Sequence, residues 1–327
     1  MLMSVEQVAS LIQSGKSLSI AGDKQLLVTL PRGQWIAGTI PYFVDDNGGI
    51  HSREKLFVTE IPAFAGAVQI ETYAVGELPD IAADAPDNGY TLLILPAGSD
   101  VHLRYAQDAP GYPNLFMKQI IGWISGVDVA ELASDKALVF DGRSGESFDN
   151  RGIALHVTLP ANKYAQIGIV NCFSQGEGDE ISFPADGFVA DVCEVNGVAK
   201  RFADYLDEIH ADTRLPLVAD YNGVAVNVSI QSVAADKSKV DLYAPVFRNV
   251  VYKFAAPIGD YVSAFAERIP EGQSANGFSC NCILNYLYGD LEGRRVSAFT
   301  GPVTFGEIAY QLLNQTLVYL QIEDTPQ

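Results

Sequence analysis

Cysteine is scarce in this chain, and long apolar runs are missing. Four cysteines among 327 residues are far too few for a disulfide scaffold of this length. The N-terminus has neither the basic start nor the apolar core of a signal peptide, and no apolar run is long enough to span a bilayer. These absences predict a cytoplasmic protein with free thiols and no membrane partner.

Basic residues are also few, which excludes a second class of partners. Lysine and arginine number 21 against 40 acidic residues, and the net charge is −19. A phosphate surface would repel such a chain, so we expect no nucleic-acid partner. Long polar tracts are absent and hydrophobic residues make up 48% of the chain, which predicts a substantial core and little disorder.

Short strand-like runs and helical patterns interleave along the chain, which predicts an α/β (α+β) fold with mixed β-sheets and flanking helices. Ser4 and Gln7 form a capping-box pattern at the start of the first helix. Residues 175–180 are polar, acidic and rich in glycine, which is typical of a boundary. We therefore expect two lobes, a domain over residues 1–180 and a second over residues 181–327.

Two neighbouring segments lead to specific expectations. Residues 98–113 are polar and irregular, with Asp100 and His102 among them, which indicates a loop. Residues 114–126 carry Leu115, Trp123 and other apolar side chains at helical spacing, which predicts a helix.

Two cysteines separated by one residue form the first candidate site. In a strand, the Cys280 and Cys282 side chains would share one face, and Asn281 would point to the other. Such a pair can line a ligand pocket, cycle as a disulfide or contribute to a metal site. The alternative is core packing, because cysteine is often buried as a small apolar residue. Further metal ligands are not visible nearby, so we predict no metal and no cofactor.

Glycines beside polar residues mark two more candidate segments. Gly301 and Gly306 allow tight turns or close approach to a ligand, and Glu307 follows at once. Glu307 could act as an acid or base or bind an amine at the mouth of a cleft, and the alternative is a solvated or capping carboxylate. Gly38 and Thr39 would let a backbone come close to a guest, with core packing as the alternative.

The four histidines are scattered along the sequence. A nucleophilic pair such as Cys280 with His102 would meet only in the fold, so the sequence leaves it open. His156 stands in an apolar run, which is more typical of a hydrogen-bonded core histidine than of a ligand.

Three separated segments, taken in order, resemble the FIST family, the sensory domains named for F-box and intracellular signal transduction proteins. The similar segments are Trp35-Ile36-Ala37-Gly38-Thr39 through Asn47-Gly48-Gly49 to Leu56-Phe57-Val58, then Val192 to Ala199 leading into Tyr205-Leu206, and finally Cys280, Gly301, Gly306-Glu307-Ile308 and Asn314-Gln315-Thr316. The sequence departs from the family where Asn281-Cys282 stands in place of an arginine that often follows the strand cysteine. The resemblance implies a diverged, stand-alone sensor of a small ligand, such as an amino acid or a related metabolite.

Three functions stay open on the sequence. The preferred prediction is a non-enzymatic sensory module with a small-molecule ligand, acting as a possible homo-oligomer or with a separate signalling partner. Its predicted ligand-binding residues are Gly38, Thr39, Cys280, Asn281, Cys282, Gly301, Gly306 and Glu307. One alternative is an enzyme with Cys280 or Cys282 as nucleophile. The other is a homo-oligomeric adaptor, which the sequence clustering of Tyr243, Phe247, Tyr252 and Tyr261 favours.

Overall fold

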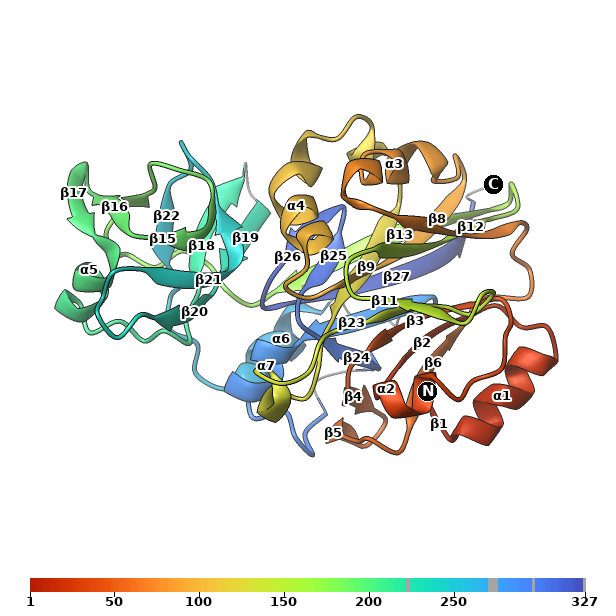
Figure 1. Cartoon of the computed structure of the whole chain (residues 1–327). Helices are drawn as coiled ribbons and strands as arrows, with labels where there is room; N and C mark the ends of the chain where they lie inside the picture. Colours follow the sequence, from red (N-terminus) through yellow and green to blue (C-terminus); the bar gives the residue numbers. More distant parts are fainter. Residues whose placement is uncertain (222–223, 270–275, 296–297, 326–327) are drawn as a thin grey trace.

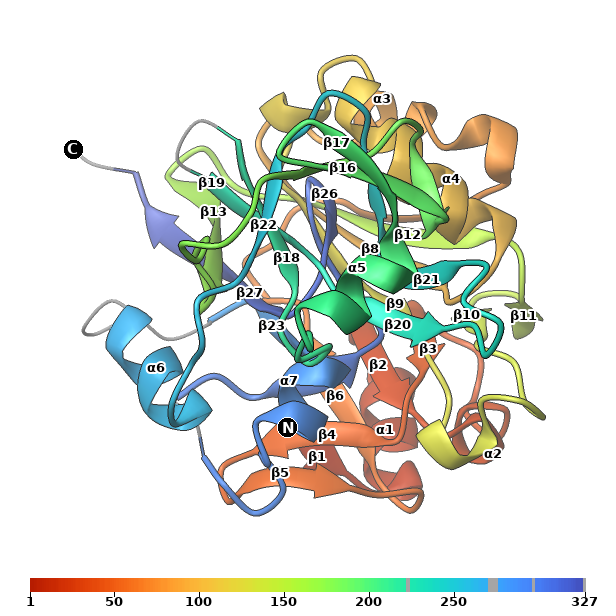
Figure 2. The same cartoon turned by 90° about the vertical axis from the view of Figure 1, so that its left-hand side faces the viewer.

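The chain folds into a large lobe and a small lobe, which lie side by side in the computed structural model (Figure 1). The structure describes residues 1–221, 224–269, 276–295 and 298–325. Three mixed sheets with flanking helices build the large lobe, whereas two antiparallel sheets and a helix build the small lobe. Figure 2, viewed from the side of the small lobe, shows its strands in front of the large lobe.

The first sheet of the large lobe carries the predicted N-terminal helix. Its strand order is β1 (Leu2–Met3), β6 (Leu56–Glu60), β2 (Leu18–Gly22), β3 (Trp35–Thr39), β10 (Val139–Asp141) and β11 (Glu146–Phe148). Helix α1 (Val5–Gln13) begins at the capping box formed by Ser4 and Gln7. Its buried residues Val8 and Ile12 pack on this sheet, and the short helix α2 (Lys24–Leu27) follows β2.

The second sheet lies at the centre of the large lobe. Its strand order is β26 (Gln311–Leu313), β25 (Glu307–Ala309), β9 (Ile120–Ser125), β8 (Gly89–Pro96), β12 (Gly152–Thr158) and β7 (Val68–Tyr73). Strands β8 and β9 run parallel and are buried along their whole length. The helix predicted over residues 114–126 is therefore wrong, because a strand covered on both faces carries a continuous apolar run that also matches helical spacing.

Helix α4 (Asp100–Asp108) connects the parallel strands β8 and β9, followed by the 3₁₀ turns η2 (Ala109–Gly111) and η3 (Leu115–Met117). The loop predicted over residues 98–113 is thus also wrong, since Ser99 caps a helix by accepting a hydrogen bond from the His102 N–H. Two short helical segments, η1 (Val75–Glu77) and α3 (Asp80–Asp84), precede β8. Helix α4 lies on the side of the large lobe that faces the small lobe (Figure 1).

The third sheet joins the two ends of the chain. Its strand order is β13 (Lys163–Asn171), β27 (Thr316–Asp324), β23 (Phe278–Cys282), β24 (Gly301–Thr304), β4 (Tyr42–Asp45) and β5 (Gly48–His51). Strands β23 and β24 are its parallel pair. Helix α7 (Ile283–Tyr288) follows β23 directly, and α6 (Tyr261–Arg268) precedes it along the chain.

The small lobe is built from one continuous stretch of chain. One sheet has the order β17 (Val198–Arg201), β16 (Val192–Val195), β14 (Ile181–Ser182), β22 (Tyr252–Phe254), β18 (Leu217–Tyr221) and β19 (Val224–Val228). The other has the order β15 (Gly187–Ala190), β21 (Val240–Val246) and β20 (Ile230–Val233). Helix α5 (Phe202–Glu208) buries Phe202, Tyr205 and Leu206 against these sheets.

The chain enters and leaves the small lobe through neighbouring backbone. Gln175 and Ala255 form an antiparallel bridge, and the Gly176 N–H donates to the Phe254 carbonyl at 2.8 Å. The chain thus leaves the large lobe close to the boundary predicted at residue 180. Strands from beyond that position return to the large lobe, because β27 pairs with β13, β24 with β4 and β25 with β9.

The predicted fold class, a mixed α/β protein with flanking helices, is confirmed by this architecture. Within the described ranges, none of the helices has both the length and the apolar character needed to cross a bilayer.

Candidate functional site

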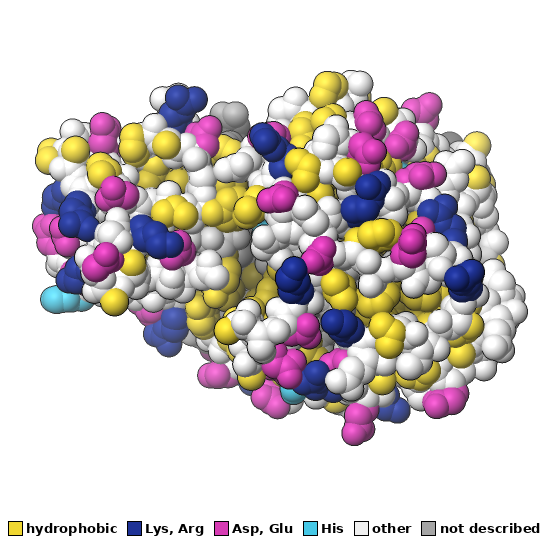
Figure 3. Space-filling model, in the orientation of Figure 1, with side chains coloured by type: hydrophobic (Ala, Val, Ile, Leu, Met, Phe, Trp, Pro, Cys, Tyr) yellow, Lys and Arg dark blue, Asp and Glu magenta, His cyan; other side chains and the backbone are white. Residues whose placement is uncertain are grey.

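A cavity with a volume of about 770 Å³ lies in the groove between the two lobes. The groove is visible in Figure 3 as a hollow between the lobes. Four lining segments directly follow strands of the large lobe: residues 97–100 after β8, Val127 after β9, Cys282 to Leu284 at the end of β23, and Phe305 after β24. The carboxyl ends of both parallel pairs therefore open into one cleft, which is where open α/β sheets bind ligands.

Apolar side chains from both lobes form most of the cleft wall. Four of them are exposed to solvent: Leu132 is 56% exposed, Val189 53%, Leu287 41% and Leu103 36%. They come from the segment after the 3₁₀ turn η4 (Val129–Glu131) and from β15, α7 and α4. Exposed apolar groups gathered around one hollow are the kind of surface at which proteins bind ligands or partners.

His102 is a buried polar group in the wall of the cleft. Its Nδ1 accepts a hydrogen bond from the Gly98 N–H at 3.1 Å, so the neutral ring carries its proton on Nε2. Burial lowers the pKa of His102 to about 4, which keeps the ring neutral near pH 7. Its Nε2 is buried and has no hydrogen-bond partner, and Phe188 of the small lobe packs edge-on against the ring.

The charged residues that line the cleft are mostly acidic. They are Asp100, Asp135, Asp149 and Asp241, with Lys136 as the single cation. Lys136 Nζ lies 2.9 Å from Asp149 and is paired with it. Asp100 stands in the first turn of α4 and accepts a hydrogen bond from Asn150.

Glu307 lies inside the protein and not at the mouth of a cleft. Its side chain is 0% exposed, and β25 holds it beside Trp123 of β9. The Thr316 N–H and hydroxyl both donate to Oε2, at 3.1 and 2.8 Å, and Thr304 Oγ1 lies 3.4 Å from Oε1. Burial raises the pKa of Glu307 to about 8, and hydrogen bonds from Thr316 and Cys282 offset only part of that effect. Near pH 7 the group is therefore mostly an uncharged acid.

Both cysteines of β23 lie close to this buried acid. Cys280 Sγ donates to the Gly122 carbonyl at 3.5 Å, and Cys282 is a hydrogen-bond partner of Glu307. Burial, and then the nearby Glu307, raise the pKa of both thiols well above the usual range. A thiol with a raised pKa is a poor nucleophile. Within the described ranges, neither thiol is hydrogen-bonded to a histidine, so the structure does not form the Cys280–His102 pair.

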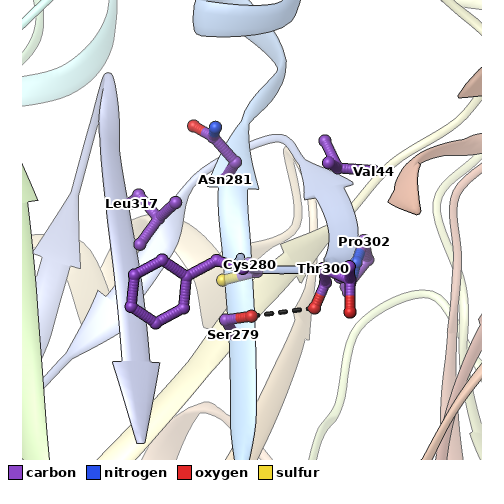
Figure 4. A pocket seen from close by; sticks show the side chains of 9 residues that line it. Val44, Ser279, Cys280, Asn281, Thr300, Pro302 and Leu317 are labelled. Atoms are coloured by element: carbon purple, nitrogen blue, oxygen red, sulfur yellow. Dashed lines mark hydrogen bonds between the residues drawn. The ribbon is translucent and has the colours of Figure 1, made fainter. Parts of the chain in front are cut away.

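Asn281 and Gly301 have structural roles around β23, where one accepts hydrogen bonds and the other allows close strand pairing. Asn281 Oδ1 accepts hydrogen bonds from the Cys282 N–H and from Asn285 Nδ2, both at 2.8 Å. Both residues line a gap of about 10 Å³ beside the Ser279–Thr300 hydrogen bond (Figure 4). That gap holds a single water at most, so it is no metabolite pocket. A Cβ on Gly301 would lie 2.0 Å from the Ser279 carbonyl oxygen, so close strand pairing requires glycine here.

Gly38 and Thr39 pack at the end of β3. A Cβ on Gly38 would lie 2.6 Å from the Trp123 ring, which accounts for the glycine by core packing. Thr39 Oγ1 accepts the Leu138 N–H at 2.9 Å, and its carbonyl accepts the Gly126 N–H at 2.7 Å. Gly306 has a φ of +154° and its carbonyl accepts the Ile124 N–H.

The structure thus brings only part of the predicted site together. Cys280, Cys282 and Glu307 form one buried cluster with Thr304, and Cys282 also reaches the cleft. The other predicted residues have structural roles in backbone pairing and core packing around that cluster, and none of them lines the cleft. They are Gly38, Thr39, Asn281, Gly301 and Gly306. Sequence reasoning missed the first turn of α4, although Ser99 and Asp100 after an apolar strand are a typical helix start.

The segment Asn314 to Thr316 links the two lobes. Asn227 of β19 donates through Nδ2 to the Asn314 carbonyl and to Asn171 Oδ1, both at 3.0 Å. Asn314 Oδ1 accepts the Ser229 N–H at 3.1 Å. Asn314 also lines the cleft, so contacts between the lobes and the cleft wall share a residue.

The aromatic residues that favoured an oligomer interface differ in exposure, since Tyr243 and Phe247 are partly buried. Tyr252 and Tyr261 are buried within the chain, where they pack on Phe183 and Phe265. Tyr243 lines the cleft. The prediction for His156 is confirmed, because its Nε2 and Nδ1 lie 2.9 and 2.8 Å from the hydroxyls of Tyr73 and Thr91.

The described ranges hold no group of three or more histidine, cysteine, aspartate or glutamate side chains placed to bind a metal ion. No curated protein matches the sequence. A family of unknown function (DUF6976) matches residues 3–323, almost the whole chain. The protein therefore belongs to this family of unknown function.

Proposed function

We propose that this protein is a non-catalytic module that binds a small molecule in the cleft between its lobes. The cleft itself is the observation that supports this most strongly. Its volume of about 770 Å³ lies in the usual range for ligand pockets, roughly 300 to 1,000 Å³. It combines mainly apolar walls with a set of polar and charged side chains, and it lies at the carboxyl ends of the parallel strands.

The sensory part of the proposal rests on how the cleft is built. Leu103 and Leu287 belong to the large lobe, whereas Val189 and Tyr243 belong to the small lobe, so a bound molecule would contact both. A ligand that contacts two bodies favours the arrangement in which both contacts are made. Binding would then change the relative position of the lobes, and a separate partner would recognise that change. The resemblance to FIST sensory domains belongs to this proposal and favours a metabolite ligand.

A matched pair of variants tests the location of binding. Val189 and Val198 are both exposed valines on strands of the small lobe, but only Val189 lines the cleft. A Val189→Trp substitution would place a large ring in the cleft, and Val198→Trp adds the same ring outside it. Tryptophan is well tolerated in strands, so both variants should fold.

The purified protein and both variants are screened by thermal shift against amino acids, biogenic amines, nucleotides and central metabolites. A compound present at about a hundred times its Kd adds about 2.7 kcal/mol to folding. We expect such a compound to raise the Tm of the parent and of Val198→Trp but not that of Val189→Trp. A hit that stabilises Val189→Trp equally places binding elsewhere, and a screen without hits contradicts the proposal.

A further inference from the structure

We infer that the cleft selects a cationic amphiphile, an amine attached to an apolar or aromatic body, over the matching acid. This inference rests on the proposed function and names the ligand class for the same cleft. Three features support it: the carboxylates around the cleft, the N–H groups at the start of α4 that the protein already uses as donors, and the His102 Nε2–H that has no hydrogen-bond partner.

The carboxylates leave the cleft with an excess of negative charge. Lys136 is already neutralised by Asp149. Asp241 pairs with Lys239 at 2.8 Å, and Asp135 reaches Lys24 only at 3.8 Å. An acid entering this space would be repelled by Asp100, the lining carboxylate outside these pairs, whereas an amine would be attracted to it.

Asp100 is the carboxylate best placed to meet an amine. It is exposed, it lines the cleft, and no ion pair of the described residues includes it. Its polar contact is the hydrogen bond that Oδ2 accepts from Asn150 Nδ2 at 3.0 Å, which leaves Oδ1 for a ligand. Apolar side chains such as Leu103 lie in the same wall, so an amine held here would keep its apolar body in the cleft.

The N-terminus of α4 does not offset this preference by offering an anion site. The Val101 N–H donates to Asn150 Oδ1 at 3.3 Å, and the His102 N–H donates to Ser99 Oγ at 3.2 Å. Free N–H groups are what allow a helix start to bind an anion, and here the protein itself occupies those of Val101 and His102.

His102 independently indicates that a ligand acceptor belongs in this wall. Its side chain is 7% exposed, it lines the cleft, and its Nε2–H has no partner. A buried donor without a partner costs roughly 1 to 3 kcal/mol, which a ligand oxygen would recover. Phe188 packs edge-on against the His102 ring, so an aromatic ligand could take the position of Phe188 against that ring. The site therefore suits an amine whose aromatic body also carries an ether, hydroxyl or carbonyl oxygen.

Three probes with one ring system separate charge from shape. They are 5-methoxytryptamine, which is cationic, 5-methoxytryptophol, which is neutral, and 5-methoxyindole-3-acetate, which is anionic. Each is titrated by calorimetry into the full chain, into Asp100→Asn and into Asp80→Asn. Asp80 is the matched control, because it is an exposed aspartate in the first turn of α3 and does not line the cleft.

We expect the amine to bind about tenfold more tightly than the acid, with the neutral probe between them. Asp100→Asn should weaken the amine about threefold to tenfold and change the neutral probe less than about twofold. Asp80→Asn should leave all three affinities unchanged. Added salt should weaken the amine more than the neutral probe, because exposed charges are screened.

Three results would overturn the inference: an acid that binds as tightly as the amine, an amine affinity that Asp100→Asn does not change, or the absence of binding by all three probes at millimolar concentration. If one of these occurs while a library compound still loses its stabilising effect in Val189→Trp, the cleft is a binding site with another ligand class. If no compound distinguishes Val189→Trp from Val198→Trp, the proposed function fails as well.

Discussion

Replacing Glu307 by glutamine should make the protein more stable in neutral and basic solution. Burial raises the pKa of Glu307 from 4.5 to about 8, so between these values the folded protein holds a proton that the unfolded chain releases. Stability then falls as the pH rises, by about 1.4 kcal/mol per pH unit. The stability that protonated Glu307 contributes is fully present below pH 4.5 and is lost as the pH approaches 8. The total loss is roughly 5 kcal/mol, of which about 3 kcal/mol has occurred by pH 7.

Glutamine is expected to keep the geometry of the protonated acid. Its carbonyl oxygen can accept from the Thr316 N–H and hydroxyl, and its amide can donate to Thr304 Oγ1, which lies 3.4 Å from Oε1. The amide does not titrate. The stability of Glu307→Gln minus that of the parent should therefore be near zero at pH 4.5 and rise to about 3 kcal/mol at pH 7.

Urea unfolding measured at unit steps from pH 5 to pH 9 tests this expectation, with the fluorescence of the buried Trp35 and Trp123 as the signal. Burial also lowers the pKa of His102 and of His156 to about 4, so their effect on stability has the opposite sign. Both histidines are present in parent and variant, and their effect cancels in the difference.

Glu146→Gln on the exposed strand β11 is the matched control and should follow the parent at every pH. If the parent and Glu307→Gln lose stability in parallel between pH 5 and pH 8, the buried acid is not the cause, and the reasoning is refuted.

Three further predictions concern packing and reactivity. Gly38→Ala should cost about 1 to 3 kcal/mol in urea unfolding because its Cβ would press on Trp123, and an unchanged midpoint would contradict this. Asn227→Ala should cost about 1 to 3 kcal/mol because buried acceptors lose their donor, and a loss well below that would show that water replaces it. Cys280 and Cys282 should react with Ellman's reagent only as fast as the protein unfolds, and fast labelling of the native protein would instead revive the nucleophile hypothesis.

Local signals in the sequence were enough for elements that form from their own residues. The Ser4 capping box begins α1 as predicted, and the Asn196-Gly197 turn has the positive φ angles that these residue types favour. Helix α6 (Tyr261–Arg268) likewise begins at its own cap, where Asp260 accepts a hydrogen bond from the Ser263 N–H. In each case the deciding contact lies within a few residues along the chain.

The sequence failed where burial is decided by distant segments. Strand β9 matches a helical pattern because Ile120, Trp123 and Ile124 are apolar at helical spacing. The strand is covered on both faces, so its remaining positions are buried too and the alternation typical of a strand is lost. Glu307 gave no sign of its burial, since Thr316 and Cys282 belong to the third sheet and reach it only because that sheet packs against the second. The cleft was missed for the same reason, because its walls come from segments far apart in the chain.

The backbone pairing of Gln175 with Ala255 gives the small lobe the connectivity of an insertion. All of its strands lie between these two positions, so the whole lobe can be exchanged or shortened without cutting a strand of the large lobe. One wall of the cleft is thus encoded by a single continuous segment, while the opposite wall is fixed to the sheets of the large lobe. Under the proposed function, changes in that segment alone would alter ligand preference, and chimaeras that exchange residues 176–254 are a direct way to test this.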